Sequence, residues 1–261
     1  MQRSLRHQTI ISTVLASRAP VAVSALSELT GASAITIRRD LAELEAQGAL
    51  RRIHGAATRS PARGTPLPFA LRADELQEPK RLIAAAIDSL VMDGQSLIID
   101  GGTTGQAIAR ALAGRPVTGL ALSLHTAAAL AERPGSRVLV PGGVLEPDSL
   151  AFEGGEAVDY VRGLRVDVAI LAACSASPEH GLTSTSPEDA RLKVACLESA
   201  SRTVLAATPD KLERTSTFRV AGAERVDVLV TTRAAHPDLL AHYGDLGVQV
   251  HLAEDLVDGP R

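Results

Sequence analysis

The sequence contains very few aromatic residues: they make up 2% of its 261 residues, and tryptophan is absent. A hydrophobic content of 45% still predicts a globular protein, with a core built from alanine, valine, leucine and isoleucine. No apolar run approaches the ~18 residues of a membrane-spanning helix, so we expect no membrane partner. The first residues lack the apolar stretch of a signal peptide, which predicts a cytoplasmic location.

Cysteine is also scarce. Cys174 and Cys196 are the two cysteines of the chain, and their spacing is not that of a metal site. We interpret both as small buried hydrophobic residues in a reducing compartment. The histidines are isolated from one another as well, so the sequence predicts neither a metal nor a cofactor.

Positive charge is concentrated near the N-terminus. Residues 1–63 contain nine arginines and four acidic residues, although the whole chain has a net charge of −3. A basic segment on an acidic body predicts that only the first part of the chain binds a polyanion such as DNA. Drift in composition is the alternative, because this excess is modest. The length is sufficient for two domains.

Residues 31–48 carry the signals of one amphipathic helix. Ser33 is a suitable N-cap and Gly48 a suitable C′ residue, and Ile37, Leu41 and Leu44 form an apolar stripe between them. Other side chains lie opposite or beside this stripe, namely Ile35, Thr36, Arg38, Arg39 and Glu43. Such a helix can pack on a core and present guanidinium groups to phosphates or guanine edges. An ordinary surface helix is the alternative interpretation.

The flanking segments predict a helix-turn-helix. We expect a first helix over residues 3–16 and a second one that is capped by Ser24 and ends at Thr30. Residues 49–57 predict a basic hairpin, or wing, with Arg51, Arg52 and His54 directed outward. The residues that we expect to face inward are Leu5, Ile10, Ile11, Val14, Leu15, Leu26, Leu29, Leu50 and Ile53.

This segment resembles the winged helix of DeoR-type bacterial regulators, the deoxyribose-operon repressor family. The resemblance is carried by Thr36-Ile-Arg-Arg-Asp-Leu41, Gly48 and Arg52-Ile-His-Gly-Ala-Ala57, and it covers about residues 5–57. It implies a DNA-binding domain over residues 1–57, with double-stranded operator DNA as its partner. Our candidate DNA-binding residues are Ser33, Ile35, Thr36, Arg38 and Arg39 on the helix and Arg51, Arg52 and His54 on the wing.

A second domain follows over residues 71–261. Residues 58–70 are rich in proline, glycine and small polar residues, which is typical of a linker. Aliphatic runs such as residues 166–172, alternating with helices, predict an α/β domain with a mainly parallel sheet buried on both faces. After a helix at 79–91, we expect strands at 96–100, 120–123, 137–140, 166–173, 203–206, 226–230 and 248–252, and helices at 105–113, 125–132, 153–162 and 187–200.

Asp100-Gly-Gly-Thr-Thr104 lies where a predicted strand ends and a helix begins. Ligands of open α/β sheets bind beyond the carboxyl ends of strands, and glycines, hydroxyls and helix N–H groups form a cradle for an anion there. A purely structural turn is the alternative. Only three of the 27 basic residues are lysines, which is consistent with a specific use of Lys193 and Lys211. Ordinary surface positions are the alternative.

The resemblance extends to the effector domain of the same regulators, whose fold is similar to that of ribose-5-phosphate isomerase. It covers about residues 75–232 and implies a sensor for a phosphorylated sugar or related metabolite. Two departures reduce the expected contacts to sugar hydroxyls, because Ala121-Leu-Ser123 replaces Thr-Asn-Ser and Thr208-Pro-Asp-Lys211 replaces Asp-x-Ser-Lys. The candidate effector-binding residues are Asp100, Gly102, Thr103, Thr104, Ser123, His125, Gly142, Gly143, Lys193 and Lys211.

These features together predict a transcriptional repressor of a metabolic operon, controlled by a small phosphorylated metabolite. One winged helix covers little DNA, so we expect a homodimer or homotetramer on repeated half-sites. The alternative is a sugar-phosphate isomerase or transferase with an accessory N-terminal domain, using an acid/base pair among Asp100, Glu188, Asp189 and Asp210. A third interpretation is a DNA-binding protein whose sensor has lost its ligand.

Overall fold

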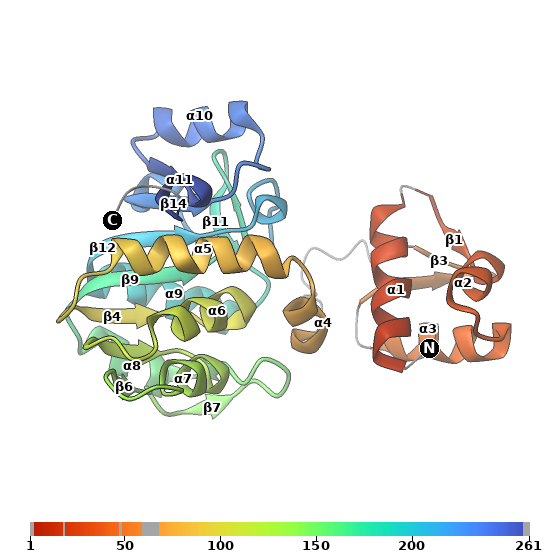
Figure 1. Cartoon of the computed structure of the whole chain (residues 1–261), viewed down its shortest axis with the longest axis horizontal. Coiled ribbons are helices and arrows are strands. Elements are labelled where there is room, and N and C mark those ends of the chain that lie inside the picture. Colours follow the sequence, from red (N-terminus) through yellow and green to blue (C-terminus); the bar gives the residue numbers. More distant parts are fainter. Residues whose placement is uncertain (1–2, 18, 47–48, 59–67, 258–261) are drawn as a thin grey trace. The chain divides into compact units, whose positions relative to one another are not determined.

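The computed structural model describes residues 3–17, 19–46, 49–58 and 68–257. The chain divides into two compact units, Met1–Arg72 and Ala73–Arg261 (Figure 1).

The first unit is a winged helix-turn-helix. Its elements are α1 (Arg3–Ala16), β1 (Val21–Ala22), α2 (Val23–Thr30), α3 (Ala34–Ala46), β2 (Arg51–Ile53) and β3 (Ala56–Thr58). The three strands form an antiparallel sheet in the order β1-β3-β2. The chain turns between α2 and α3 at Gly31, whose positive φ of 68° closes the C-terminus of α2. The buried aliphatic residues of all three helices form one core, made by Ile10, Ile11, Val14, Val23, Leu26, Ile37, Leu41, Leu44, Ala49, Leu50 and Ala57.

Three residues that we expected to face inward are exposed. Leu5 is 54% exposed because the buried residues of α1 lie on the opposite side of that helix. Leu29 is 57% exposed, since Val23, Leu26 and Thr30 form the buried stripe of α2 and Leu29 lies roughly 90° from its centre. Ile53, at the end of β2 next to the hairpin turn, is 38% exposed because it extends beyond the core.

The expected cap of α2 is also wrong. The N-cap residue is Ala22, which makes no side-chain cap hydrogen bond, and Ser24 lies inside the helix. The expectations for Gly48 and for the side chain of Leu15 lie outside the described residues.

The second unit is an α/β domain around a seven-stranded sheet. All its strand pairs are parallel, in the order β15-β14-β12-β9-β4-β5-β6. The strands are β4 (Ser96–Ile99), β5 (Thr118–Ala121), β6 (Arg137–Leu139), β9 (Val166–Ala172), β12 (Ala200–Ala206), β14 (Val228–Thr231) and β15 (Gln249–Leu252). Each corresponds to one strand of the sequence prediction, and the mainly parallel α/β fold is confirmed.

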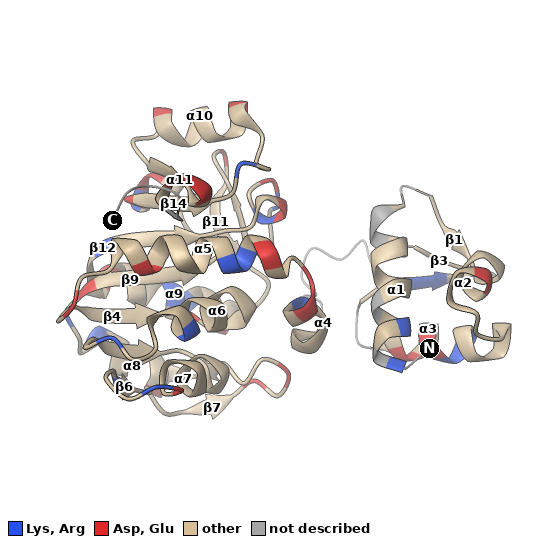
Figure 2. Ribbon diagram, in the orientation of Figure 1, with Lys and Arg blue, Asp and Glu red and all other residues tan. Residues whose placement is uncertain are grey.

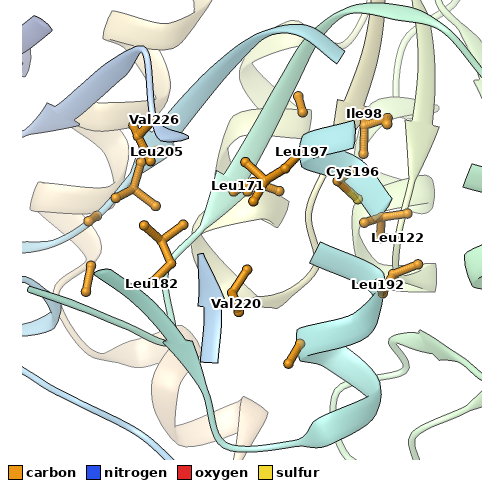
Figure 3. Packing of buried hydrophobic residues seen from close by; sticks show 14 of the residues in the cluster. Ile98, Leu122, Leu171, Leu182, Leu192, Cys196, Leu197, Leu205, Val220 and Val226 are labelled. Atoms are coloured by element: carbon orange, nitrogen blue, oxygen red, sulfur yellow. The ribbon is translucent and has the colours of Figure 1, made fainter. Parts of the chain in front are cut away.

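Helices cover both faces of this sheet. One face packs against α5 (Gln77–Leu90), α6 (Gly102–Leu112), α7 (Leu124–Leu130) and α11 (Ala253–Val257). The other packs against α8 (Gly155–Arg162), α9 (Pro187–Ser199) and α10 (Pro237–Asp245). Figure 3 shows part of the second interface, where Leu192, Cys196 and Leu197 of α9 meet Ile98 and Leu171 of the sheet. A short helix, α4 (Phe69–Asp74), precedes α5 and begins inside the expected linker.

Several short elements of this unit were not predicted. A small antiparallel sheet contains β10 (Ser175–Ser177), β11 (Gly181–Ser184) and β13 (Phe218–Ala221), and β7 (Val144–Leu145) pairs with β8 (Phe152–Glu153). The 3-10 helices are η1 (Pro209–Lys211) and η2 (Ala223–Arg225). These strands have only two to four residues each, which is too short for a detectable periodicity. Within the described part of the chain, no helix is both long and apolar enough to cross a membrane.

Candidate functional site

Helix α3 presents a mixed apolar and cationic face. Ser33 accepts a hydrogen bond from the backbone N–H of Thr36 at 3.2 Å, which is the predicted N-cap. Ile37 and its buried stripe anchor the helix, whereas Arg38 and Arg39 are exposed and Ile35 is 77% exposed. Neither arginine forms an ion pair with any residue that the structure describes. A surface-exposed isoleucine beside two uncommitted guanidinium groups suits a DNA groove better than bulk water.

The wing lies directly after this helix. Strands β2 and β3 meet at His54 and Gly55, and the positive φ of 70° at Gly55 makes the tight turn. Arg51, Arg52 and His54 are all exposed. Their predicted contacts with phosphates remain predictions.

Arg52 has a partner within the domain that the sequence did not reveal. Its backbone N–H donates to Oε1 of Glu45 at 2.7 Å, and its Nε donates to Oε2 of Glu45 at 2.6 Å. These bonds keep the carboxyl pKa of Glu45 below its ordinary value. Arg52 therefore ties the wing to the last turn of α3, and its guanidinium has a partner within the domain.

In the second unit, Asp100 lies at the carboxyl end of β4 and is 4% exposed. Its Oδ1 accepts from the N–H of Gly101 at 2.7 Å, and its Oδ2 accepts from the N–H of Ala172 on β9 at 2.9 Å. Its Oδ2 also lies 3.0 Å from Nζ of Lys193. Burial raises the pKa of this carboxyl, and the ammonium of Lys193 offsets only part of that effect.

Lys193 is held between two carboxylates. This residue of α9 is 5% exposed, and its Nζ also lies 2.5 Å from Oδ1 of Asp189, one turn earlier. Ser184 donates to Asp189 at 2.5 Å, and the half-buried Cys174 thiol donates to it at 3.7 Å. Burial alone would lower the pKa of Lys193, but the two carboxylates outweigh it and hold the pKa well above its ordinary value. We expected Lys193 to face the effector, whereas its charge is compensated inside the protein.

The N-terminus of α6 begins next to Asp100. Its N-cap, Gly101, makes no side-chain cap hydrogen bond. Thr103 is buried, and Thr104 is half-buried. A Cβ atom at Gly105 would lie 2.0 Å from the carbonyl oxygen of Asp100, so only glycine permits this close approach of helix and strand. The first-turn N–H groups of α6 are thus the strongest candidate for an anion site.

Ser123 and Thr126 support the same turn from α7. Ser123 caps α7 by accepting from the N–H of Thr126 at 3.1 Å, and its hydroxyl donates to Oγ1 of Thr126 at 2.9 Å. Oγ1 of Thr126 in turn donates to the carbonyl oxygen of Asp100 at 3.1 Å. Ser123 is fully buried, so its position indicates structural support for residues 100–101. The neighbouring His125 is half-buried.

The other candidates lie farther along the sheet edge. Lys211 follows β12, where its Nζ lies 3.3 Å from Oδ2 of Asp210, and Gly142 and Gly143 follow β6. Strands β12 and β6 are each two strands away from β4, or about 10 Å on either side of Asp100. The structure therefore brings together Asp100, Thr103, Ser123 and Lys193. It does not bring Lys211 or the glycine pair into direct contact with them.

Comparisons with known proteins match both units. The model of the DeoR-like helix-turn-helix domain matches residues 6–61, and the model of the DeoR C terminal sensor domain matches residues 75–233. The HTH-type transcriptional regulator GolR of Listeria innocua is 28% identical, over 90% of this chain and 92% of its own length. The glycerol-3-phosphate regulon repressor of Haemophilus influenzae is 31% identical, over 88% of this chain and 90% of its own length.

Among solved structures, ribose 5-phosphate isomerase A of Methanocaldococcus jannaschii matches with a TM-score of 0.38 and 18% identity. That match covers 52% of this chain and 54% of the isomerase. It carries no argument for an isomerase activity here.

Proposed function

This chain belongs to the DeoR family of DNA-binding transcriptional regulators, and we propose that it represses a metabolic operon until a small phosphorylated metabolite binds its second unit. The family consists of regulators and not of enzymes, which sets aside the isomerase or transferase alternative. The observation that carries the proposal is α3, whose apolar stripe is buried while Ile35, Arg38 and Arg39 remain exposed.

In this proposal, the N-terminal half of α3 enters the major groove. Arg38 and Arg39 donate to guanine edges or phosphates, Ile35 contacts a thymine methyl group, and Thr36 contacts a base edge. The wing residues Arg51 and His54 contact phosphates and fix the register of the domain. Several such readers on repeated half-sites would reach useful affinity, so we propose a homodimer or homotetramer. It acts in the cytoplasm, where operator DNA is accessible.

The proposed effector site depends on how the negative charge of Asp100 is compensated. A phosphate at the N-terminus of α6 would lie next to the buried carboxylate of Asp100, which by itself would repel it. Lys193 reduces that repulsion, because its ammonium, which it shares with Asp189, is 3.0 Å from the Asp100 carboxylate. Gly102, Thr103 and Thr104 can then donate to the anion, and the rest of the molecule can extend along the edge toward Lys211 or toward Gly142 and Gly143.

The proposed class of effector is based on the groups around the N-terminus of α6 and on one relative. The regulator of Haemophilus influenzae described above is named for glycerol 3-phosphate, a short phosphorylated polyol. Ala121 and Leu122 provide no side-chain donor or acceptor where a sugar hydroxyl would be bound. We therefore propose a phosphorylated sugar or polyol that needs few hydroxyl contacts on this side.

The test has two arms with purified full-length protein. A duplex selected by the protein from a random-sequence pool, and a random duplex of equal length, are titrated by fluorescence anisotropy at one salt concentration. Thermal shift is then measured with glycerol 3-phosphate, glucose 6-phosphate, ribose 5-phosphate and inorganic phosphate. A ligand at 100 times its dissociation constant should stabilise the second unit by about 2.7 kcal/mol.

Each arm can fail separately. Equal affinity for the two duplexes would contradict the role in DNA recognition. Selective DNA binding without any thermal shift would support the alternative in which the sensor has lost its ligand.

A further inference from the structure

Asp40 is a charged residue in the buried stripe of the recognition helix. It lies between Ile37 and Leu44 on the inner face of α3 and is 3% exposed. We expected an apolar stripe on this face, and the role proposed for α3 makes no use of Asp40. A carboxylate at this position needs a specific explanation, because burying a charge among aliphatic side chains is costly unless the charge is paired.

Two residues of α1 bind this carboxylate. Arg6 donates from Nε to Oδ2 at 2.5 Å and from Nη2 to Oδ1 at 3.2 Å, and Nε2 of His7 lies 3.1 Å from Oδ1. Both partners are themselves shielded from water, with side chains 13% and 10% exposed. Burial by itself raises the pKa of Asp40, but the hydrogen bonds from Arg6 and His7 outweigh it and bring this pKa below its ordinary value.

A second pair between the same helices lies at the surface. Arg3 of α1 pairs with Glu43 of α3, and their side chains are 55% and 33% exposed. Figure 2 shows basic residues of α1 beside acidic residues of α3 in this unit. Exposed pairs of this kind contribute little, so Arg3 and Glu43 provide a matched control for the buried pair.

Buried ion pairs contribute little net stability compared with apolar packing, but they can fix one arrangement of helices. An aliphatic stripe allows a helix to rotate slightly at small cost, whereas the fork of Arg6 fits the carboxylate in few orientations. Asp40 directly follows Arg38 and Arg39 in the sequence. A rotation of α3 by about 20° would move a guanidinium group that lies roughly 9 Å from the helix axis by about 3 Å. That displacement is as long as the hydrogen bond that the guanidinium must make.

We propose that Arg6 and His7 act through Asp40 as positioning residues that fix the rotation of α3 and thereby set the selectivity for operator sequence. They do not touch DNA in this account. The inference rests on the proposed reading of DNA by α3, and it adds a determinant of selectivity on a different helix.

The variant Asp40→Asn tests the proposal, because a purely electrostatic effect and a positioning role predict opposite changes in affinity for the selected duplex. Loss of one negative charge on a DNA-binding domain should tighten binding to every duplex. A positioning role predicts that affinity for the selected duplex falls while affinity for the random duplex stays the same or rises. The ratio of the two affinities should fall about tenfold or more, comparable to the loss of one good base contact.

The experiment uses the full chain and the two duplexes of the anisotropy titration. Glu43→Gln removes the same charge from the exposed pair and should leave the ratio within about twofold of wild type. The double variant Arg6→Gln/Asp40→Asn should lose no more selectivity than Asp40→Asn alone, because both changes break the same contact. Circular dichroism and melting curves show whether each variant is folded.

Two results would overturn the inference: a folded Asp40→Asn protein with the wild-type ratio, or an equal loss of ratio in Glu43→Gln. Should Asp40→Asn fail to fold, Arg6→Gln and His7→Gln decide the question, because each disrupts hydrogen bonds to the carboxylate and keeps Asp40 itself. A wild-type ratio in both would then refute it. A wild-type protein without any sequence preference would instead contradict the role in DNA recognition.

Discussion

Nζ of Lys193 on α9 lies 3.0 Å from Oδ2 of Asp100, which directly follows β4, an interior strand of the seven-stranded sheet. The contact joins two elements 93 positions apart and places the compensating charge beside the N-terminus of α6. We therefore propose that Lys193 acts on the effector site through the electrostatic environment of Asp100.

Replacement of Lys193 by methionine should strongly destabilise the second unit. The change leaves Asp100 and Asp189 buried without their shared cation, and removal of one partner from a buried ion pair costs about 3–5 kcal/mol. Lys211→Met is the control, because Lys211 is partly exposed and should cost less than about 1 kcal/mol. Urea unfolding followed by far-UV circular dichroism measures both. Equal free energies of unfolding for the two variants would show that Lys193 is not needed to compensate the carboxylates.

Substitution of Arg39 by alanine should weaken binding to the selected duplex by about 1–3 kcal/mol if this side chain reads a base. Arg51→Ala should weaken binding to the selected and random duplexes alike, since a phosphate contact carries no sequence information. Anisotropy titrations over a range of salt concentrations separate the two effects. An unchanged affinity for Arg39→Ala would remove this residue from the interface.

The Arg52–Glu45 pair makes it possible to distinguish a structural role of Arg52, anchoring the wing to α3, from direct contact with phosphate. If Arg52 mainly anchors the wing to α3, Glu45→Gln should reproduce the loss of DNA affinity seen in Arg52→Ala. If Arg52 mainly contacts phosphate, Glu45→Gln should instead tighten binding, because a negative charge is lost and the guanidinium is released. From the two hydrogen bonds in the structure, we expect the first result.

The stability of the first unit should depend on pH through Asp40. Its pKa is lower in the folded protein than in the unfolded chain, so the stabilisation is fully present above the unfolded value, about 4. It should be lost as the pH falls through the folded pKa. Unfolding free energies of wild type and Asp40→Asn, measured at several pH values between about 3 and 6, should therefore converge as the pH decreases. A constant difference over that range would contradict the pairing.

Much of this fold could be predicted because the signals were local. Helix α1 begins and ends where its pattern indicated, Ser33 caps α3, and the aliphatic runs identified every strand of the parallel sheet. The errors at Leu5 and Leu29 came from counting apolar residues without their angular positions.

The candidate site was less predictable because its contacts are long-range. The sequence showed that Lys193 was unusual, but it could not show that Asp100 and Asp189 surround it. Likewise, Arg-Arg-Asp on α3 gave no indication that the aspartate turns inward toward Arg6. The small sheet of β10, β11 and β13 was not predicted because its strands have three or four residues and because β13 pairs with a strand far away in the sequence.

The central claim is that α3 reads DNA sequence. Its most direct test is the ratio of affinities for the selected and random duplexes, measured with the wild-type full-length chain at one physiological salt concentration. We expect a ratio of about a thousand or more, as for other specific DNA-binding proteins. A ratio near one, with a correctly folded protein, would contradict it.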